Sequence, residues 1–198
     1  MVNRMITSYR KFLAKYYYNF VFIHINKTGG SSIEKALNLP FEHKTAKEKI
    51  DELGQDLWLK KISFSVIRNP WDKVVSHYHY RVKTNQTGMG DKHIDFNSWV
   101  KLSYGEKDIR YYDQPKMFMP QVEWLKNSDG QVCVMKILRF ESIESDFNNL
   151  MKELGIKASL PHLKKTDHRN YVDYYDNESR EIVKEVFAED IEFFGYLF

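Results

Sequence analysis

The chain has 198 residues, which is enough for one sizeable hydrophobic core and rather few for two. Its 42% hydrophobic and 29% charged residues are typical of a globular protein, and a net charge of +3 is too small to indicate nucleic acid as a bulk partner. The single cysteine, Cys133, excludes a disulfide framework within the chain and fits a reducing compartment.

Residues 1–19 are expected to form an amphipathic lead-in helix or tail ahead of a single domain over 20–198. Basic residues alternate there with Phe12, Leu13 and several tyrosines. A signal peptide would need a continuous apolar stretch and a small-residue cleavage site, and a membrane span would need a longer apolar run. We therefore expect a cytoplasmic protein, with this segment as a candidate for peripheral contact with a membrane surface.

The next segments alternate between strand and helix patterns. The apolar run 20–25 predicts a buried strand, and the helix behind it is expected to be capped by Ser31 or Ser32. A second helix is expected over about 46–57, followed by a strand over 62–67.

Pro70 suits the first turn of the helix after that second strand. Polar residues predict a loop over 85–93, and residues 131–138 predict a third strand in which Cys133 is buried. A helix from about 143 to 154 has Gly155 as its natural C-cap, and a last amphipathic helix follows near the C-terminus. This alternation predicts an α/β fold, a three-layer sandwich with a mainly parallel central sheet.

The turn over residues 26–32 has the composition of an anion-binding site. Gly29 and Gly30 permit close backbone approach, the amides and dipole at a helix start attract negative charge, and Lys27 adds a full positive charge. The alternative is a tight turn with a serine cap and a solvated lysine. An ATP or GTP loop is disfavoured, because its lysine follows the glycines and a further glycine opens it. Hydroxyl donors come from Thr28, Ser31 and Ser32.

A second candidate site follows the 62–67 strand. Arg68 ends that strand and Ser76 lies two helical turns further on, so a guanidinium fork and a hydroxyl could hold one phosphate. The alternative is an Arg68–Asp72 ion pair with Ser76 facing solvent. Because ligands gather at the carboxyl ends of parallel strands, the turn over 26–32 and Arg68 are expected to converge.

Together these segments resemble the sulfotransferases that use 3′-phosphoadenosine 5′-phosphosulfate (PAPS). The turn over 26–32 is similar to the family's 5′-phosphosulfate loop, with Asn26 where proline is usual, and Arg68 and Ser76 keep the spacing of its 3′-phosphate motif. The resemblance is to the membrane-type and bacterial carbohydrate branch and runs from about residue 20 to the C-terminus. Lys136 departs from it, since an acidic residue is common there. Further similar segments are Gln121-x-x-Trp124, Leu138-Arg139-Phe140-Glu141, Leu160-Pro161-His162-Leu163 and the tail Glu189–Tyr196.

The resemblance implies a P-loop-like sulfotransferase fold, PAPS as donor, and a hydroxyl acceptor on a glycan or glycolipid. No metal is expected, because a sulfate ester needs little charge neutralisation and the seven histidines show no chelating pattern. Lys27 is the expected catalytic group at the leaving oxygen. Donor-binding residues implied by the resemblance are Lys27, Thr28, Gly29, Gly30, Ser31, Ser32, Arg68 and Ser76, with Lys165 and Arg169 from a late basic loop.

The acceptor hydroxyl also needs a general base. His43 lies in the interval where similar carbohydrate enzymes carry their catalytic histidine, and it is favoured; Glu42, His77 and His79 stay open as alternatives. Two other functions remain possible from the residues alone. One is a kinase-like nucleotide phosphotransferase, which the lysine order disfavours. The other is a nucleotide-bisphosphate-binding module without catalysis, which would tolerate loss of Lys27 and His43.

Overall fold

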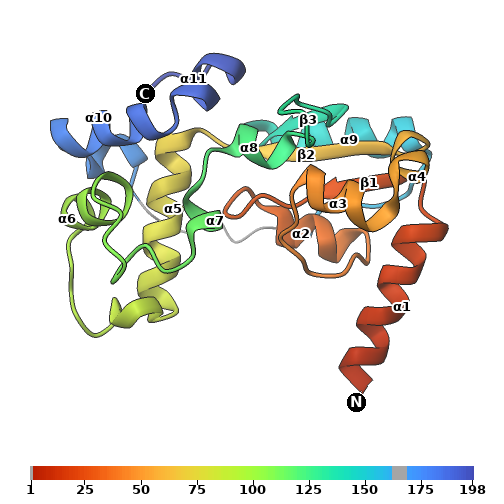
Figure 1. Cartoon of the computed structure of the whole chain (residues 1–198), viewed down its shortest axis with the longest axis horizontal. Coiled ribbons are helices and arrows are strands. Elements are labelled where there is room, and N and C mark those ends of the chain that lie inside the picture. The colour runs from red at the N-terminus through yellow and green to blue at the C-terminus, as the bar shows by residue number, and fades with distance from the viewer. Residues whose placement is uncertain (1, 162–168) are drawn as a thin grey trace. The chain divides into compact units, whose positions relative to one another are not determined.

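The computed structural model describes residues 2–161 and 169–198, which form two compact units. The first unit contains the residues up to Ile67 together with the segment that begins at Glu123. The second unit contains Arg68–Val122 and the C-terminal segment that ends at Phe198. Figure 1 labels the helices and strands of both.

A parallel three-stranded sheet is the centre of the first unit. Its strands are β1 (Phe20–Ile23), β2 (Ile62–Ile67) and β3 (Lys136–Arg139), in the order β1-β2-β3. The middle strand pairs in parallel with both neighbours. Parallel neighbours require crossover connections, and the segments between these strands carry helices, as the sequence predicts.

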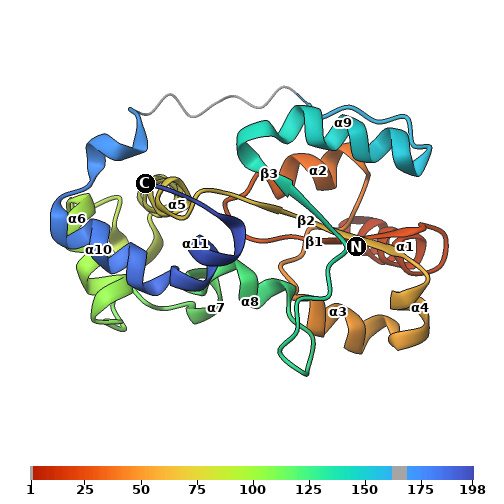
Figure 2. The same cartoon turned by 90° about the horizontal axis from the view of Figure 1, so that it is seen from above.

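Helices cover both faces of this sheet. Figure 2 shows α2 (Gly30–Ala36) and α9 (Ile143–Leu154) on one side, and α3 (Ala46–Leu53) with α4 (Gln55–Leu59) on the other. The predicted three-layer α/β architecture with a parallel sheet is confirmed. The core beneath α2 and α9 is built from Phe22, Ile33, Leu37, Phe64, Val66, Leu138, Phe147, Leu150 and Met151.

Several element boundaries agree with the sequence pattern. The lead-in segment is a helix, α1 (Val2–Tyr16), and β2 occupies the predicted range. Pro70 is the first residue of α5 (Pro70–Lys83), whose N-cap Asn69 accepts hydrogen bonds from the two amides that follow Pro70. Gly155 ends α9 with a φ of 68°, the left-handed geometry expected of a glycine C-cap.

Two helix boundaries in the first unit differ from the prediction. The N-cap of α2 is Gly29, with a φ of 85° and no side-chain cap, so the predicted Ser31 or Ser32 cap is wrong. The left-handed glycine starts the helix at Gly30 and places both serines inside its first turn. The single helix expected over 46–57 is also wrong, because Gly54 (φ 83°) ends α3 and precedes α4.

The third strand is shorter than predicted, since it begins at Lys136 and not at 131. Val132 instead forms an isolated antiparallel bridge with Lys126 across a turn that contains Gly130. Cys133 is therefore half-buried outside any strand, which corrects the expectation of a buried strand residue. The local turn takes the backbone partners that a longer strand would have used.

The second unit is helical, and its core is aromatic. Trp71 of α5 packs in one cluster with Trp99, Tyr104, Phe118 and Phe187. The predicted 85–93 loop contains one short 3₁₀ turn, Gln86–Gly88. In the described ranges 2–161 and 169–198, no helix is both long and apolar enough to cross a bilayer. The other helices are α6 (Phe96–Val100), α7 (Pro115–Phe118), α8 (Gln121–Leu125, shared by both units), α10 (Asn177–Val186) and α11 (Ala188–Phe194).

Candidate active site

The turn between β1 and α2 has an unusual backbone. Lys27 has a φ of 66° and Gly29 a φ of 85°, so two of its residues are left-handed. That conformation costs a lysine about 1–2 kcal/mol, and such strain is concentrated at ligand clamps and active sites. The fully buried Thr28 holds the turn by donating from Oγ1 to the carbonyl of Ile25 at 2.9 Å. Lys27 itself is partly exposed.

The backbone at both glycines of the turn is closely packed against neighbouring side chains. A Cβ on Gly30 would lie 2.1 Å from Cδ2 of His24, so the imidazole occupies the space of a side chain. A Cβ on Gly29 would lie 3.1 Å from Ile143 and 3.2 Å from Phe140. Phe140, from the segment 138–141 that carries part of the family resemblance, thus packs against the turn at Gly29. The glycines let the backbone approach these neighbouring side chains closely.

His24 and Glu34 form a buried pair next to Gly30. His24 Nδ1 lies 2.8 Å from Glu34 Oε1, and both side chains are almost fully buried. A carboxylate oxygen can only accept, so Nδ1 of His24 carries the proton. The same Oε1 also accepts the backbone N–H of Glu42 at 3.1 Å. Glu34 therefore joins the end of β1 to the segment around residue 42, and sequence patterns gave no signal for this role.

His43 is fixed by the same strand end. Its Nδ1 lies 3.0 Å from the carbonyl oxygen of His24. Because a carbonyl only accepts, Nδ1 is the donor, and a neutral His43 has its lone pair on Nε2. The His43 ring lies 4.2 Å from the ring of His24 and contacts Phe41 and Trp124. The predicted base and the predicted donor loop therefore lie within one compact unit, joined through His24.

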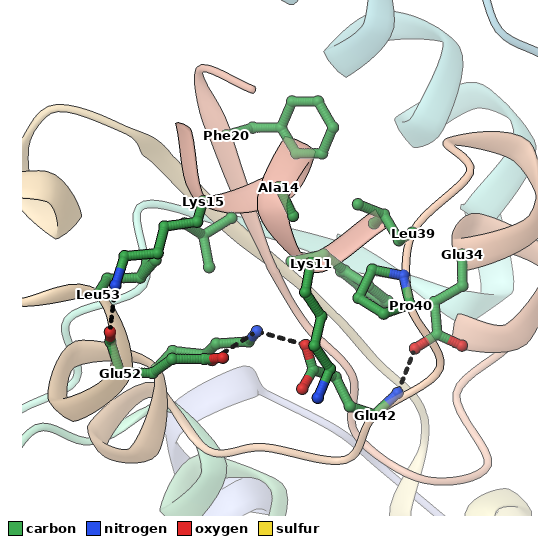
Figure 3. A pocket seen from close by; sticks show the side chains of 13 residues that line it. Lys11, Ala14, Lys15, Phe20, Glu34, Leu39, Pro40, Glu42, Glu52 and Leu53 are labelled. Atoms are coloured by element: carbon green, nitrogen blue, oxygen red, sulfur yellow. Dashed lines mark hydrogen bonds and ion pairs between the residues drawn. The ribbon is translucent and has the colours of Figure 1, made fainter. Parts of the chain in front are cut away.

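Glu42, the neighbouring alternative base, is engaged in ion pairs. Its carboxylate lies 2.6 Å from Lys49 and 3.1 Å from Lys44, and both lysines also pair with Glu52. Burial alone would raise the pKa of Glu52, but the two lysines outweigh it and lower that pKa. The carboxylate of Glu42 is therefore held between two lysines. Figure 3 shows the Glu42 and Glu52 carboxylates of this network.

The pocket in Figure 3 adjoins this network in the first unit. Its cavity of about 40 Å³ has room for a few water molecules, whereas sites for nucleotide-sized ligands measure several hundred Å³. It is therefore too small to be a donor site. The wall is formed by Lys11, Ala14 and Lys15 of α1, by β1, by Glu34, Leu39, Pro40 and Glu42, and by Lys49, Glu52 and Leu53 of α3.

In the second unit, Arg68 is buried and its backbone is braced on both sides. Its N–H donates to Gln121 Oε1 at 2.9 Å, and its carbonyl accepts from Gln121 Nε2 at 2.8 Å. The Nε of Arg68 donates to Asp72 at 2.7 Å, which is the ion pair considered as an alternative from the sequence. That pair uses one of five guanidinium N–H donors. Ser76 lies one helical turn beyond Asp72 and is half-buried.

Asp190 completes the brace around Arg68. It is fully buried and accepts from the Gln121 backbone at 2.8 Å, from Gln121 Nε2 at 3.1 Å and from the Val122 backbone at 2.8 Å. Burial raises the pKa of Asp190, although these donors oppose the shift. Gln121 and Asp190 belong to segments that resemble the family, but the sequence gave them no role. In the structure Gln121 holds the backbone of Arg68, and Asp190 holds Gln121.

Residues 10–197 match the family model described as "Sulfotransferase family". The chain belongs to the sulfotransferase family. Its fold is similar to the crystal structure of a sulfotransferase from Alicyclobacillus acidocaldarius, with a TM-score of 0.50, 15% identity and coverage of 88% of this chain and 93% of that one. No curated protein sequence matches the chain significantly. The family and the sulfotransferase fold expected from the sequence are thus confirmed, without a distinction between branches of the family.

The other histidines considered as bases in this sulfotransferase lie in its second unit. His77 is buried and its Nδ1 pairs with the hydroxyl of Tyr104 at 3.0 Å, while rings of Trp99 and Phe118 pack on it. It is a core residue as packed here. His79 is half-buried, and its Nε2 pairs with the hydroxyl of Tyr174 at 3.0 Å.

Of the remaining residues named from the sequence, some lie in the described ranges of this sulfotransferase and some do not. Arg169 is exposed. Lys136, which departs from the family pattern, forms an ion pair with Glu153 at 2.7 Å. The predicted Lys165, like His162 of the similar segment 160–163, lies outside the described residues. Across the ranges 2–161 and 169–198, no three His, Cys, Asp or Glu side chains gather in a group that could hold a metal ion.

Proposed function

We propose that this sulfotransferase moves the sulfuryl group of PAPS to a hydroxyl of a carbohydrate by in-line displacement. One observation carries the proposal: His43 is hydrogen-bonded to the strand end that leads into the turn over 26–32. This hydrogen bond joins the proposed base to the strand end that precedes the proposed phosphosulfate loop. A non-catalytic nucleotide-binding module would have no need for that arrangement.

The donor is proposed to be held at its two charged ends. The turn over 26–32 binds the 5′-phosphosulfate, with backbone N–H groups exposed by Gly29 and Gly30 and with the ammonium of Lys27. Since α2 has only seven residues, the turn and Lys27 supply more of this attraction than a helix dipole does. Arg68 and Ser76 bind the 3′-phosphate. Further contacts to the donor are proposed for Thr28, Ser31, Ser32, Lys165 and Arg169.

The proposed reaction is a single transfer. The Nε2 of His43 accepts the proton of the acceptor hydroxyl as its oxygen forms a bond to sulfur. The bond between sulfur and the bridging phosphate oxygen breaks at the same time, and adenosine 3′,5′-bisphosphate leaves. Lys27 stabilises the negative charge that develops on that bridging oxygen. The proposed chemistry requires no metal ion, because Lys27 and the turn amides offset the charge.

The acceptor is proposed to be a glycan or glycolipid hydroxyl, by similarity to the carbohydrate branch. We propose that the protein acts in the cytoplasm, since its only cysteine cannot form an internal disulfide. A net charge of +3 with no extended basic tract supports an anionic small-molecule donor and not nucleic acid as partner.

Thermal shift with nucleotides tests the donor. Adenosine 3′,5′-bisphosphate at about 100 times its Kd stabilises a protein by roughly 2.7 kcal/mol, which for this chain length is a rise in Tm of about 5–10 °C. Mg-ATP at the same concentration is expected to give much less. The Ser76→Ala variant should reduce the advantage of the bisphosphate over adenosine 5′-monophosphate, because only the bisphosphate has a 3′-phosphate. Equal stabilisation by bisphosphate and Mg-ATP would refute PAPS as donor.

The acceptor is tested by transfer of ³⁵S-labelled sulfate from PAPS to a panel of glycans, glycolipids and small alcohols. Labelled product on a sugar hydroxyl supports the carbohydrate assignment. Transfer only to phenols or simple alcohols, together with the expected bisphosphate binding, would retain the donor and overturn the acceptor.

A further inference from the structure

The apolar face of α1 points away from its own unit. Met5, Tyr9, Phe12 and Tyr16 are spaced four, three and four residues apart, so they share one face of the helix. Their side chains are between 49% and 69% exposed. The rings of Phe12 and Tyr16 lie 5.1 Å apart, so the face is a continuous aromatic surface. We call these four residues the aromatic stripe of α1.

The opposite side of α1 contacts the body of the first unit. Ala14 packs there against the main core, while Lys15, at the edge of the stripe with its Nζ 5.6 Å from the centre of the Tyr16 ring, donates to the carbonyl of Glu52 at 3.1 Å. Lys11, Ala14 and Lys15 line the pocket of Figure 3. A helix on a protein surface normally turns its apolar side inward. In α1 the aromatic stripe is outside, and Figure 1 shows the helix extending away from the sheet of its unit.

The charge of this segment indicates what covers the stripe. Four basic residues, Arg4, Arg10, Lys11 and Lys15, lie in the first 16 positions, and no acidic residue precedes Glu34 in the sequence. A second copy of α1 packed on the stripe would bring like charges together. An anionic surface would attract them.

Length separates a helix that lies on a bilayer from one that spans it. With 15 residues at 1.5 Å each, α1 is about 22 Å long, whereas the hydrocarbon core of a bilayer is about 30 Å thick. Tyrosine rings with an apolar body and a polar tip are suited to the level of the headgroups. An aromatic face combined with basic residues is the pattern of a helix that lies in the membrane interface.

We propose that α1 docks this sulfotransferase on an anionic lipid bilayer, with the aromatic stripe at the acyl-chain boundary and Lys11 and Lys15 near the lipid headgroups. The proposal depends on α1 alone and is independent of the donor and acceptor assignments. It also specifies an orientation, since Ala14, which packs on the core of the unit, is on the side of α1 opposite the stripe.

Co-sedimentation of the full chain with vesicles tests this. Binding is expected to vesicles of phosphatidylcholine containing about 30 mol% phosphatidylserine, to be much weaker on phosphatidylcholine alone, and to fall as salt rises from about 0.1 to 0.5 M. A Tyr9→Ser, Phe12→Ser double variant should lose at least about tenfold in partitioning, with an unchanged Tm. Phe193→Ser is the matched control, because Phe193 is 56% exposed and lies outside α1.

Two results would overturn the proposal. One is equal binding of wild type and the double variant, or of anionic and neutral vesicles. The other is a concentration-dependent dimer in sedimentation velocity that the double variant abolishes, which would assign the stripe to a second copy of the chain.

Discussion

Replacing Gly30 by alanine would place a methyl group where the ring of His24 lies. The new Cβ would be 2.1 Å from Cδ2, 2.4 Å from Nε2 and 2.7 Å from Cγ of that ring, and atoms in ordinary contact are at least 3.4 Å apart. The ring is buried and its Nδ1 is bonded to Glu34 at 2.8 Å, so it cannot move without loss of that bond.

The size of the effect follows from these contacts. Overpacking of a core costs about 1–3 kcal/mol, and a lost hydrogen bond to a charged group about 1.5–3 kcal/mol. Alanine in a helix would by itself be favoured over glycine by about 0.5–1 kcal/mol. We expect Gly30→Ala to destabilise the protein by about 2–4 kcal/mol, a fall in Tm of about 5–15 °C.

A double-mutant cycle identifies the cause. Since the three nearest atoms all belong to His24, the His24→Ala, Gly30→Ala double variant should be more stable than the sum of the single effects by at least about 1 kcal/mol. Urea unfolding followed by far-UV circular dichroism gives the four free energies. Gly105→Ala is the matched control, because its new Cβ would meet only Ile182 at 3.4 Å, and it should change stability by about 0.5 kcal/mol at most. Additive effects, or a Gly30→Ala protein as stable as wild type, would refute this packing argument.

Three further predictions concern the reaction and the brace around Arg68. Lys27→Ala should lower kcat about 10²–10³-fold without a change in Tm, whereas Lys35→Ala, exposed on α2, should leave kcat unchanged in the labelled-sulfate assay. His43→Gln should lower kcat and remove the loss of activity at acid pH that protonation of the imidazole causes; an unchanged acid limb would assign the base elsewhere. Burial raises the pKa of Asp190 above 3.8, so the folded state binds its proton more tightly than the unfolded state does. The stability of wild type relative to Asp190→Asn should therefore decrease as pH rises from 3.8 through the folded pKa, and a urea series that gave the opposite slope would contradict the role of burial.

Local sequence patterns were sufficient for much of the fold. The apolar run 62–67 matches β2, Pro70 starts α5, and Gly155 ends α9, because each signal depends on the residue's own backbone preferences. The turn over 26–32 likewise lies where the pattern predicts it, between β1 and α2, and its lysine-before-glycine order differs from the motif of a triphosphate loop.

Other local expectations failed where a glycine or a turn changed the path of the chain. The serine cap of α2 was displaced by the left-handed Gly29, and Gly54 divided one expected helix into two. Residues 131–134 lie outside the sheet, where Val132 pairs with Lys126. In each case the pattern of apolar residues was compatible with both outcomes, and backbone geometry chose between them.

The sequence by itself determined the family and the parallel α/β architecture and supplied the residues of the candidate site, since these depend on short segments. Only the tertiary structure decided how those residues are held. Glu34 meets His24 across 10 residues, His43 meets His24 across 19, and Asp190 meets Gln121 across 69. Such hydrogen bonds form only after the strands and helices have packed, because burial makes an unsatisfied polar group costly enough to select its partner.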